Sequence, residues 1–198
     1  MNLVERALHL LRTLKALDHE AALVGGLAVS ARTRPRFTRD VDFAVAVDSD
    51  EEAEAVVRAM QQQGFRLLSV IEQDAKKVLS TVRFRHPRDR GSEPTIDLLF
   101  GSTGIEREIV QCATPVEIAE NISLPVARIG HLIAMKVLSE SAVRDQDRGD
   151  LRVLLTVASA DELEEAEKAV QLIEERGFAR GKDLPAALAS FIAEMRLE

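Results

Sequence analysis

The chain has 198 residues, of which 46% are hydrophobic and 30% charged, a composition ordinary for a soluble globular protein with a real core. Its formal net charge of −7 argues against general coating of nucleic acids, and its few aromatic residues, all Phe, argue against base stacking. A single cysteine, Cys112, excludes an intrachain disulfide, and no apolar run is long enough to span a membrane. We therefore expect a cytoplasmic protein without a membrane partner.

Strands dominate the first two thirds of the chain and helices the last third. Hydrophobic periodicity, turn residues and two capping-box patterns (Ser49 with Glu52, Ser159 with Glu162) predict the element boundaries. The predicted elements are a helix at 2–18, a strand at 21–24, a helix from 27 to 32, a strand at 41–47, a helix to about 63, strands at 65–71, 78–84 and 95–100, a short helix at 104–110, an extended piece at 114–118, and helices at 127–140, 145–158, 161–176 and 184–196. This order predicts an α+β fold with a core at 1–125 and a C-terminal helical region at 126–198 packed on it.

Gly25 and Gly26 lie where the strand at 21–24 turns into a helix. Backbone N–H groups at such a turn can face a ligand with no Cβ in the way, and the helix N-terminus adds partial positive charge. The pair therefore predicts a phosphate-binding turn, although a plain turn has the same sequence.

Asp40 and Asp42 are two residues apart at the start of the next strand, so both side chains project from one face. Two carboxylates this close repel one another unless a cation lies between them, and hard oxygen ligands suit Mg²⁺ or Mn²⁺. The alternative interpretation is a solvated strand edge.

Asp97 lies in an otherwise apolar strand, TIDLLF, where a lone carboxylate is costly without a partner. Next to Asp40 and Asp42 it would complete a site of three carboxylates and two metal ions. One ion would hold a triphosphate, the other would activate an attacking hydroxyl, and Asp97 could accept the proton. The alternative is a capped or salt-bridged aspartate at a strand end.

Three segments, VGGLAVSARTRPRFTRDVDFAV, TIDLLF and HLIAMKVLSESAVRDQDRGDLRVLL, together resemble the nucleotidyltransferase AbiEii/AbiGii toxin family of type IV toxin–antitoxin systems. The resemblance covers about residues 15–158 and implies the nucleotidyltransferase-like fold of the polymerase-beta superfamily, a mixed sheet flanked by helices, in the core at 1–125. It implies nucleotide binding by Gly25 and Gly26, metal binding and catalysis by Asp40, Asp42 and Asp97, and a later nucleotide-binding motif of Lys136, Arg144, Asp147 and Asp150.

Two groups of charged residues have two interpretations each. Lys136 and Arg144 could contact nucleotide phosphate or the acceptor, oriented by Asp147 and Asp150, or these residues could form a surface salt-bridge ladder. Arg39, with the neighbouring Arg32, Arg34 and Arg36, could grip phosphate or an RNA backbone, or be solvated loop charge.

The expected function is that of an enzyme, a nucleotidyltransferase (EC 2.7.7-type) dependent on Mg²⁺ or Mn²⁺. It would move NMP from an NTP to a hydroxyl of RNA, tRNA or protein, as a toxin with a cognate antitoxin. Two alternatives stay open: an antibiotic-type adenylyltransferase acting on a small molecule, and a nucleotide-binding or interaction module without turnover.

Overall fold

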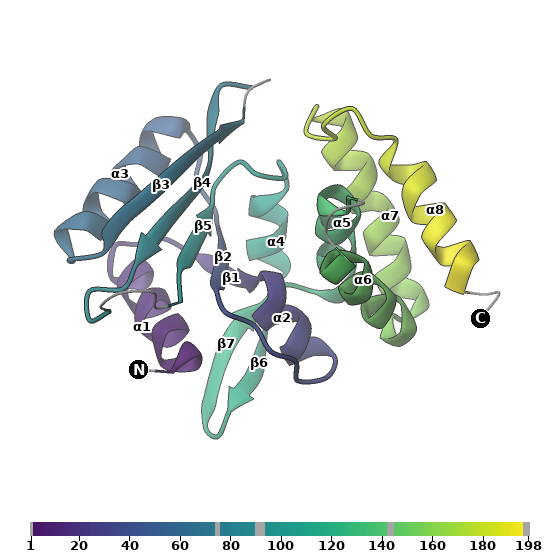
Figure 1. Cartoon of the computed structure of the whole chain (residues 1–198). Coiled ribbons are helices and arrows are strands. Elements are labelled where there is room, and N and C mark those ends of the chain that lie inside the picture. Colours follow the sequence, from purple (N-terminus) through teal and green to yellow (C-terminus); the bar gives the residue numbers. More distant parts are fainter. Residues whose placement is uncertain (1, 74–75, 90–93, 142–144, 196–198) are drawn as a thin grey trace.

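The structure is a computed structural model that describes residues 2–73, 76–89, 94–141 and 145–195. Each predicted element has a counterpart, and strands give way to helices after Val126 (Figure 1). In chain order the elements are α1 (Leu3–Ala16), β1 (Ala21–Val24), α2 (Gly25–Arg32), β2 (Val41–Val45), α3 (Asp50–Gln62), β3 (Arg66–Gln73), β4 (Val78–Arg85), β5 (Ile96–Leu99), α4 (Glu106–Cys112), β6 (Thr114–Ala119), β7 (Ile122–Val126), α5 (Ile129–Ser139), α6 (Asp145–Val157), α7 (Ala160–Glu175) and α8 (Leu184–Met195).

The strands form one mixed sheet in the order β3-β4-β5-β2-β1-β7-β6. The two central strands that carry the aspartates, β2 and β5, run parallel, and β1 runs antiparallel to β2. Parallel neighbours start at the same edge of a sheet, so residues near the start of β2 and β5 lie side by side. The predicted mixed sheet flanked by helices is therefore confirmed.

Register decides which side chains share a face. Val41 of β2 lies beside Ile96 of β5, which lies beside Phe84 of β4, and all three are fully buried on one face. The helices α1 and α3 lie on this side of the sheet, and α4 and the C-terminal helices lie on the other (Figure 1). One step along each strand, Asp42, Asp97 and Arg83 project from the opposite face, on the side of the sheet where α4 and the C-terminal helices lie (Figure 1).

Strand β7 was not predicted, and several boundaries differ from the prediction by one or two residues. β7 contains Pro125, whose missing N–H weakens the sequence signal for a strand. The strand tolerates this proline because it meets β1 at a single position, Leu23 with Val126. Helix α2 begins at Gly25, two residues earlier than predicted, and β2 ends at Val45 instead of Val47.

The C-terminal helices pack around α5, which contacts α6, α7 and α8 and is buried along most of its length. All four predicted helices are present, whereas the division at residue 126 stays a prediction. Within the described ranges, none of the helices is both long enough and apolar enough to cross a bilayer.

His131 of α5 is 5% exposed, and its Nδ1 has no hydrogen-bond partner in the described part of the chain. Burial, followed by the charge of Arg128, lowers the pKa of His131 to about 4, with Glu108 opposing this and Glu165 4.0 Å away. The unfolded chain, with an ordinary histidine pKa, takes up a proton more readily than the folded protein between these two pKa values. Stability is therefore lost as the pH falls from about 6.5 to about 4.

We expect the free energy of unfolding to fall by up to about 1.4 kcal/mol per pH unit through this histidine over that range. Urea unfolding at several pH values would measure it, with His131→Gln as the variant that lacks the titrating ring. A slope that is the same in the wild type and in His131→Gln would show that the ring is not held neutral.

Candidate functional site

Asp42 of β2 and Asp97 of β5 occupy paired positions on adjacent parallel strands, so their side chains leave the same face of the sheet. Arg83 of β4 pairs with Asp97 on its other side and binds both carboxylate oxygens, Nε to Oδ1 at 2.8 Å and Nη2 to Oδ2 at 2.7 Å. Asp40, just before β2, accepts hydrogen bonds at Oδ1 from the N–H and the hydroxyl of Thr95, at 3.0 and 2.8 Å. The structure thus brings the three predicted aspartates together at one edge.

Asp42 has no hydrogen-bond donor and no ion-pair partner among the residues that the structure describes, although it is half-buried. Burial first, and then the negative charges of Asp97 and Asp40, raise the pKa of Asp42 to about 7. A buried carboxylate with two like-charged neighbours is stabilised by a cation, and oxygen ligands of this kind suit Mg²⁺ or Mn²⁺. The residues therefore fit a divalent ion.

The carboxylates are not already arranged as a set of metal ligands, a statement that holds for the described ranges. Two of them have other partners: Asp97 is salt-bridged by Arg83, as one alternative from the sequence had it, and Asp40 is held through Oδ1 by Thr95. Only Asp42 has both oxygens uncommitted. The metal role of the three residues stays a prediction.

Helix α2 begins beside Asp42 without a side-chain cap, because its N-cap residue is Val24. Gly25 has a φ of +64°, and a Cβ built on it would lie 2.0 Å from Asp42 Oδ2. Only glycine meets both conditions, since other residues rarely adopt a positive φ and any side chain would displace the carboxylate. The uncapped N–H groups of the first turn, the glycine and the carboxylate thus form one concave surface suited to phosphate oxygens.

A cavity of about 260 Å³ opens onto this surface. Its polar lining comes from Gly25, Gly26, Asp42, Ser102, Thr103, Lys136, Ser139, Asp147 and Arg180, and its apolar lining from Val24, Leu99, Leu132, Met135 and Leu138. The lining thus combines backbone N–H groups and cations with aliphatic side chains, the two kinds of group that a nucleotide site needs.

Lys136 of α5 makes ion pairs with two carboxylates of α6, Asp147 at 2.6 Å and Asp150 at 2.8 Å. Asp150 also binds Arg36, which precedes β2, at 2.6 Å. Asp147 and Asp150 are buried, at 8% and 3% exposure, so the ion pairs of the salt-bridge interpretation are present, but they are buried and not at the surface. One buried carboxylate thus joins three elements, and Lys136 reaches the cavity from this network.

We expect Asp150→Ala to lower the free energy of unfolding by about 3 kcal/mol, because it removes the counter-ion of two partly buried cations. Urea unfolding measures this, with Glu54→Ala as the control. Glu54 pairs with Arg58 at 3.1 Å, but both side chains are more than half exposed, so its loss should cost less than about 0.5 kcal/mol. Equal effects of the two substitutions would contradict a structural role of the buried network.

Sequence reasoning missed Arg83, Arg180 and the role of Arg36. Arg180, in the connection before α8, lines the cavity and donates to the carbonyl of Ser102 at 3.0 Å. Arg83 and Arg180 have no sequence signal, because each comes from an element far along the chain and only the fold brings it near. The role of Arg36 was missed because its partner, Asp150, is distant in sequence. Arg39 is exposed and does not line the cavity, and Arg144 lies outside the described residues.

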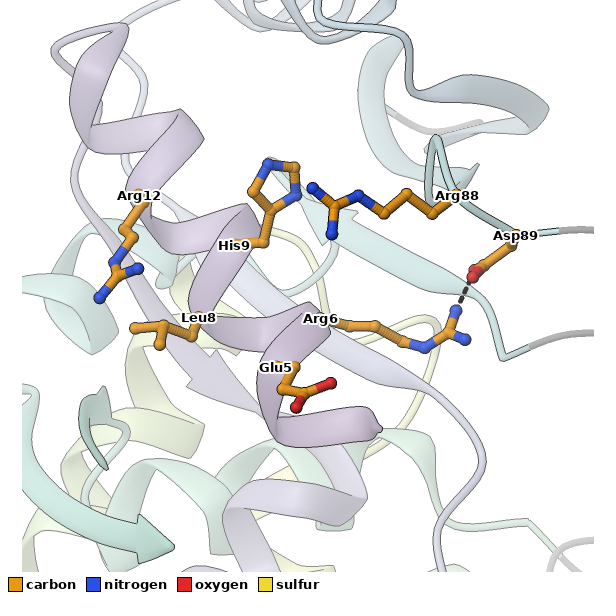
Figure 2. Close-up of a pocket in the computed structure, with 7 residues that line it drawn as sticks. All are labelled: Glu5, Arg6, Leu8, His9, Arg12, Arg88 and Asp89. Carbon is orange, nitrogen blue, oxygen red and sulfur yellow. Dashed lines mark hydrogen bonds and ion pairs between the residues drawn. The ribbon is translucent and has the colours of Figure 1, made fainter. Parts of the chain in front are cut away.

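A larger cavity, about 560 Å³, lies elsewhere, on the outer side of α1 near the turn after β4 (Figure 2). Arg6 and Asp89 form an ion pair across it, and His9 accepts or donates a 2.7 Å hydrogen bond at Nδ1 with His86. Arg12 points away from this pair (Figure 2). Its charged groups do not converge on one point, so size does not make this groove the functional site.

The comparisons with known proteins concern the family and the fold of the chain. The family model described as "Nucleotidyl transferase AbiEii toxin, Type IV TA system" matches residues 9–197. No curated protein matches the chain significantly in sequence.

Among solved structures, the chain is similar to an antigenic nucleotidyltransferase-like protein from Paracoccidioides brasiliensis, with a TM-score of 0.51, 20% identity, and coverage of 93% of this chain and 90% of that one. This likeness shows the fold. The lincomycin-bound lincosamide antibiotic adenylyltransferase LnuA matches with a TM-score of 0.49, 13% identity and coverage of 78% and 97%. The antibiotic-resistance factor ANT(2'')-Ia matches with a TM-score of 0.45, 16% identity and coverage of 98% and 95%.

The match over nearly the whole chain, on a fold and a glycine–carboxylate arrangement that suit nucleotidyl transfer, shows that the chain belongs to the AbiEii nucleotidyltransferase toxin family of type IV toxin–antitoxin systems.

Proposed function

We propose that the protein transfers the NMP of an NTP to an acceptor hydroxyl in the presence of Mg²⁺ or Mn²⁺, and that it acts in the cytoplasm as a toxin with a cognate antitoxin. The acceptor is a hydroxyl of RNA, tRNA or protein. One observation carries the proposal: the uncommitted carboxylate of Asp42 lies against Gly25, at the uncapped start of α2, inside a cavity that Lys136 also lines.

Each group of site residues has a separate role in phosphoryl transfer. The N–H groups of the first turn of α2, with Lys136 and Arg180, bind the phosphates, and Asp147 and Asp150 orient Lys136. Asp40 and Asp42 hold the metal ion, which supplies charge neutralisation for the phosphates when bound.

Asp97, held by Arg83, accepts the proton of the acceptor hydroxyl. The acceptor oxygen forms a bond to the α-phosphorus, the bond from that phosphorus to the bridging oxygen breaks, and pyrophosphate leaves with the electron pair.

Labelling tests the reaction. The purified protein is incubated with each α-³²P-labelled NTP, Mg²⁺ and separate RNA and protein fractions of a cell extract, with EDTA and Asp42→Asn reactions alongside. Labelled RNA or protein that requires both Mg²⁺ and Asp42 supports the proposal. Label only on added lincosamide or aminoglycoside would identify an antibiotic-type adenylyltransferase, and NTP binding without any labelled acceptor would identify a binding module. Both results overturn the proposal as stated.

The toxin role has its own test, because it concerns the cell and not the reaction. Induced expression of the wild-type chain is expected to stop bacterial growth, whereas Asp42→Asn at equal protein level is not. Equal growth of both strains would remove the toxin role and leave the transfer reaction standing.

A further inference from the structure

The loop between α2 and β2, residues 33–40, is held by one arginine just before it and by another in its middle. Arg32, at the end of α2, donates to the carbonyls of Ala127 and Val126 at 2.9 and 2.7 Å. Arg36, in the middle of the loop, binds Asp150 of α6 at 2.6 Å and donates to the carbonyl of Phe37 at 3.0 Å. These bonds set the backbone of the loop in one position.

The same loop lies against the proposed phosphate site. A Cβ built on Gly26 would lie 2.8 Å from Thr38 Oγ1 and 2.9 Å from Arg36 Nη2. At its far end the loop runs directly into Asp40, one of the proposed metal ligands. Whatever binds the outer surface of the loop is therefore next to the reacting groups.

The outer surface combines one aromatic ring with two unengaged cations. Phe37 is 81% exposed, whereas the other phenylalanines are buried or half-buried. Arg34 and Arg39 are exposed on either side of it and make no hydrogen bond or ion pair with any described residue. The segment 33–39 holds no acidic residue, although the chain carries a net charge of −7. The structure thus separates the four arginines of this region into two that anchor the loop and two that do not.

We propose that Phe37, Arg34 and Arg39 bind the single-stranded end of a nucleic-acid acceptor, an inference that rests on the proposed function. A base stacks on the Phe37 ring and the flanking phosphates contact Arg34 and Arg39, which places the terminal hydroxyl toward Asp40. The small number of aromatic residues in the sequence argued against base stacking. One exposed ring next to the site is nevertheless sufficient to stack one base. The negative charge of the rest of the chain confines the contact to this loop.

The affinity of the full-length protein for a fluorescent single-stranded oligoadenylate RNA of about 12 nucleotides tests the inference. It is measured by anisotropy in EDTA without NTP, so that no transfer occurs. Phe37→Ala and Phe37→Leu are expected to weaken binding about 10-fold, and Phe37→Trp to preserve it, because stacking needs a π-face and a leucine offers only apolar area. Arg34→Gln and Arg39→Gln should each reduce the slope of log Kd against log salt by about 0.7.

Arg12→Gln is the matched control, since Arg12 is an exposed arginine in the groove beside α1 (Figure 2) and makes no hydrogen bond or ion pair in the described ranges. It should change neither affinity nor slope. Wild-type affinity in Phe37→Leu, equal effects of the Arg12 and Arg34 substitutions, or no RNA binding at all would overturn the inference.

The two proposals fail separately. NTP-dependent labelling of a protein acceptor without RNA binding would remove the acceptor surface and leave nucleotidyl transfer intact. RNA binding through Phe37 without labelling of any acceptor would do the reverse.

Discussion

Asp42→Asn is expected to reduce nucleotidyl transfer on the order of 10³-fold or more while the protein stays folded. Asparagine keeps the shape of the side chain but removes the one carboxylate of the three site aspartates that has neither a hydrogen-bond donor nor an ion-pair partner among the described residues. Without it the divalent ion loses a charged ligand next to the phosphates. The free energy of unfolding in EDTA should rise by about 1 kcal/mol, since a buried charge beside Asp97 and Asp40 disappears.

Initial rates of label transfer and urea unfolding in EDTA measure the two effects. Asp48→Asn is the matched control, because Asp48 lies just beyond β2, is exposed, and pairs with Arg107 at the surface. Its activity and stability should remain those of the wild type. Activity of Asp42→Asn above a tenth of the wild type, or loss of its fold, would remove Asp42 from the catalytic role.

Gly25→Ala is expected to weaken binding of an NTP and Mg²⁺ at least about 10-fold, a loss of about 1.4 kcal/mol, and to lower the free energy of unfolding by about 1–2 kcal/mol. The reason is geometric: the new Cβ would lie 2.0 Å from Asp42 Oδ2, on a residue with a φ of +64°. Either the carboxylate or the turn at the start of α2 must move. Calorimetry with a non-hydrolysable NTP analogue and urea unfolding follow the two effects.

Gly149→Ala provides the control for this substitution. Gly149 lies inside α6, and a Cβ there meets nothing within 4 Å. Alanine should therefore leave NTP binding unchanged and stabilise the helix by about 0.5–1 kcal/mol. If the two alanines had the same effect on binding, the close contact between Gly25 and Asp42 would be irrelevant to the site.

The sequence predicted most of the elements because their signals are local. Helix starts at Ser49 and Ser159 follow from capping chemistry that the structure confirms, with each hydroxyl accepting from the backbone N–H three residues on. Strand β7 was not predicted because it contains a proline, which is unfavourable within a strand. The proline is tolerated because of how β7 pairs with β1, a strand distant in sequence.

The site residues likewise fall into those that local sequence predicts and those that only the tertiary structure reveals. The glycine pair and the two aspartates before and within β2 lie within one short segment, so their spacing already carries information. Arg83 comes from β4, and no local pattern reveals that β4 lies beside β5. Its salt bridge with Asp97 gives the third carboxylate a partner that the sequence did not predict. The ionic network of Asp150 depends on the packing of α6 on α5 and on the loop before β2, which only the tertiary structure provides.

Asp150 accepts from both Arg36 and Lys136, so three residues of three separate segments share one charge balance. Loss of Asp150 leaves Arg36 without its counter-ion, whereas Lys136 keeps Asp147, and loss of either cation leaves Asp150 with a single partner. We therefore expect positions 36, 136 and 150 to change together during evolution. A chimera that takes its C-terminal helices from a relative should fold only if it also takes the loop before β2 from that relative.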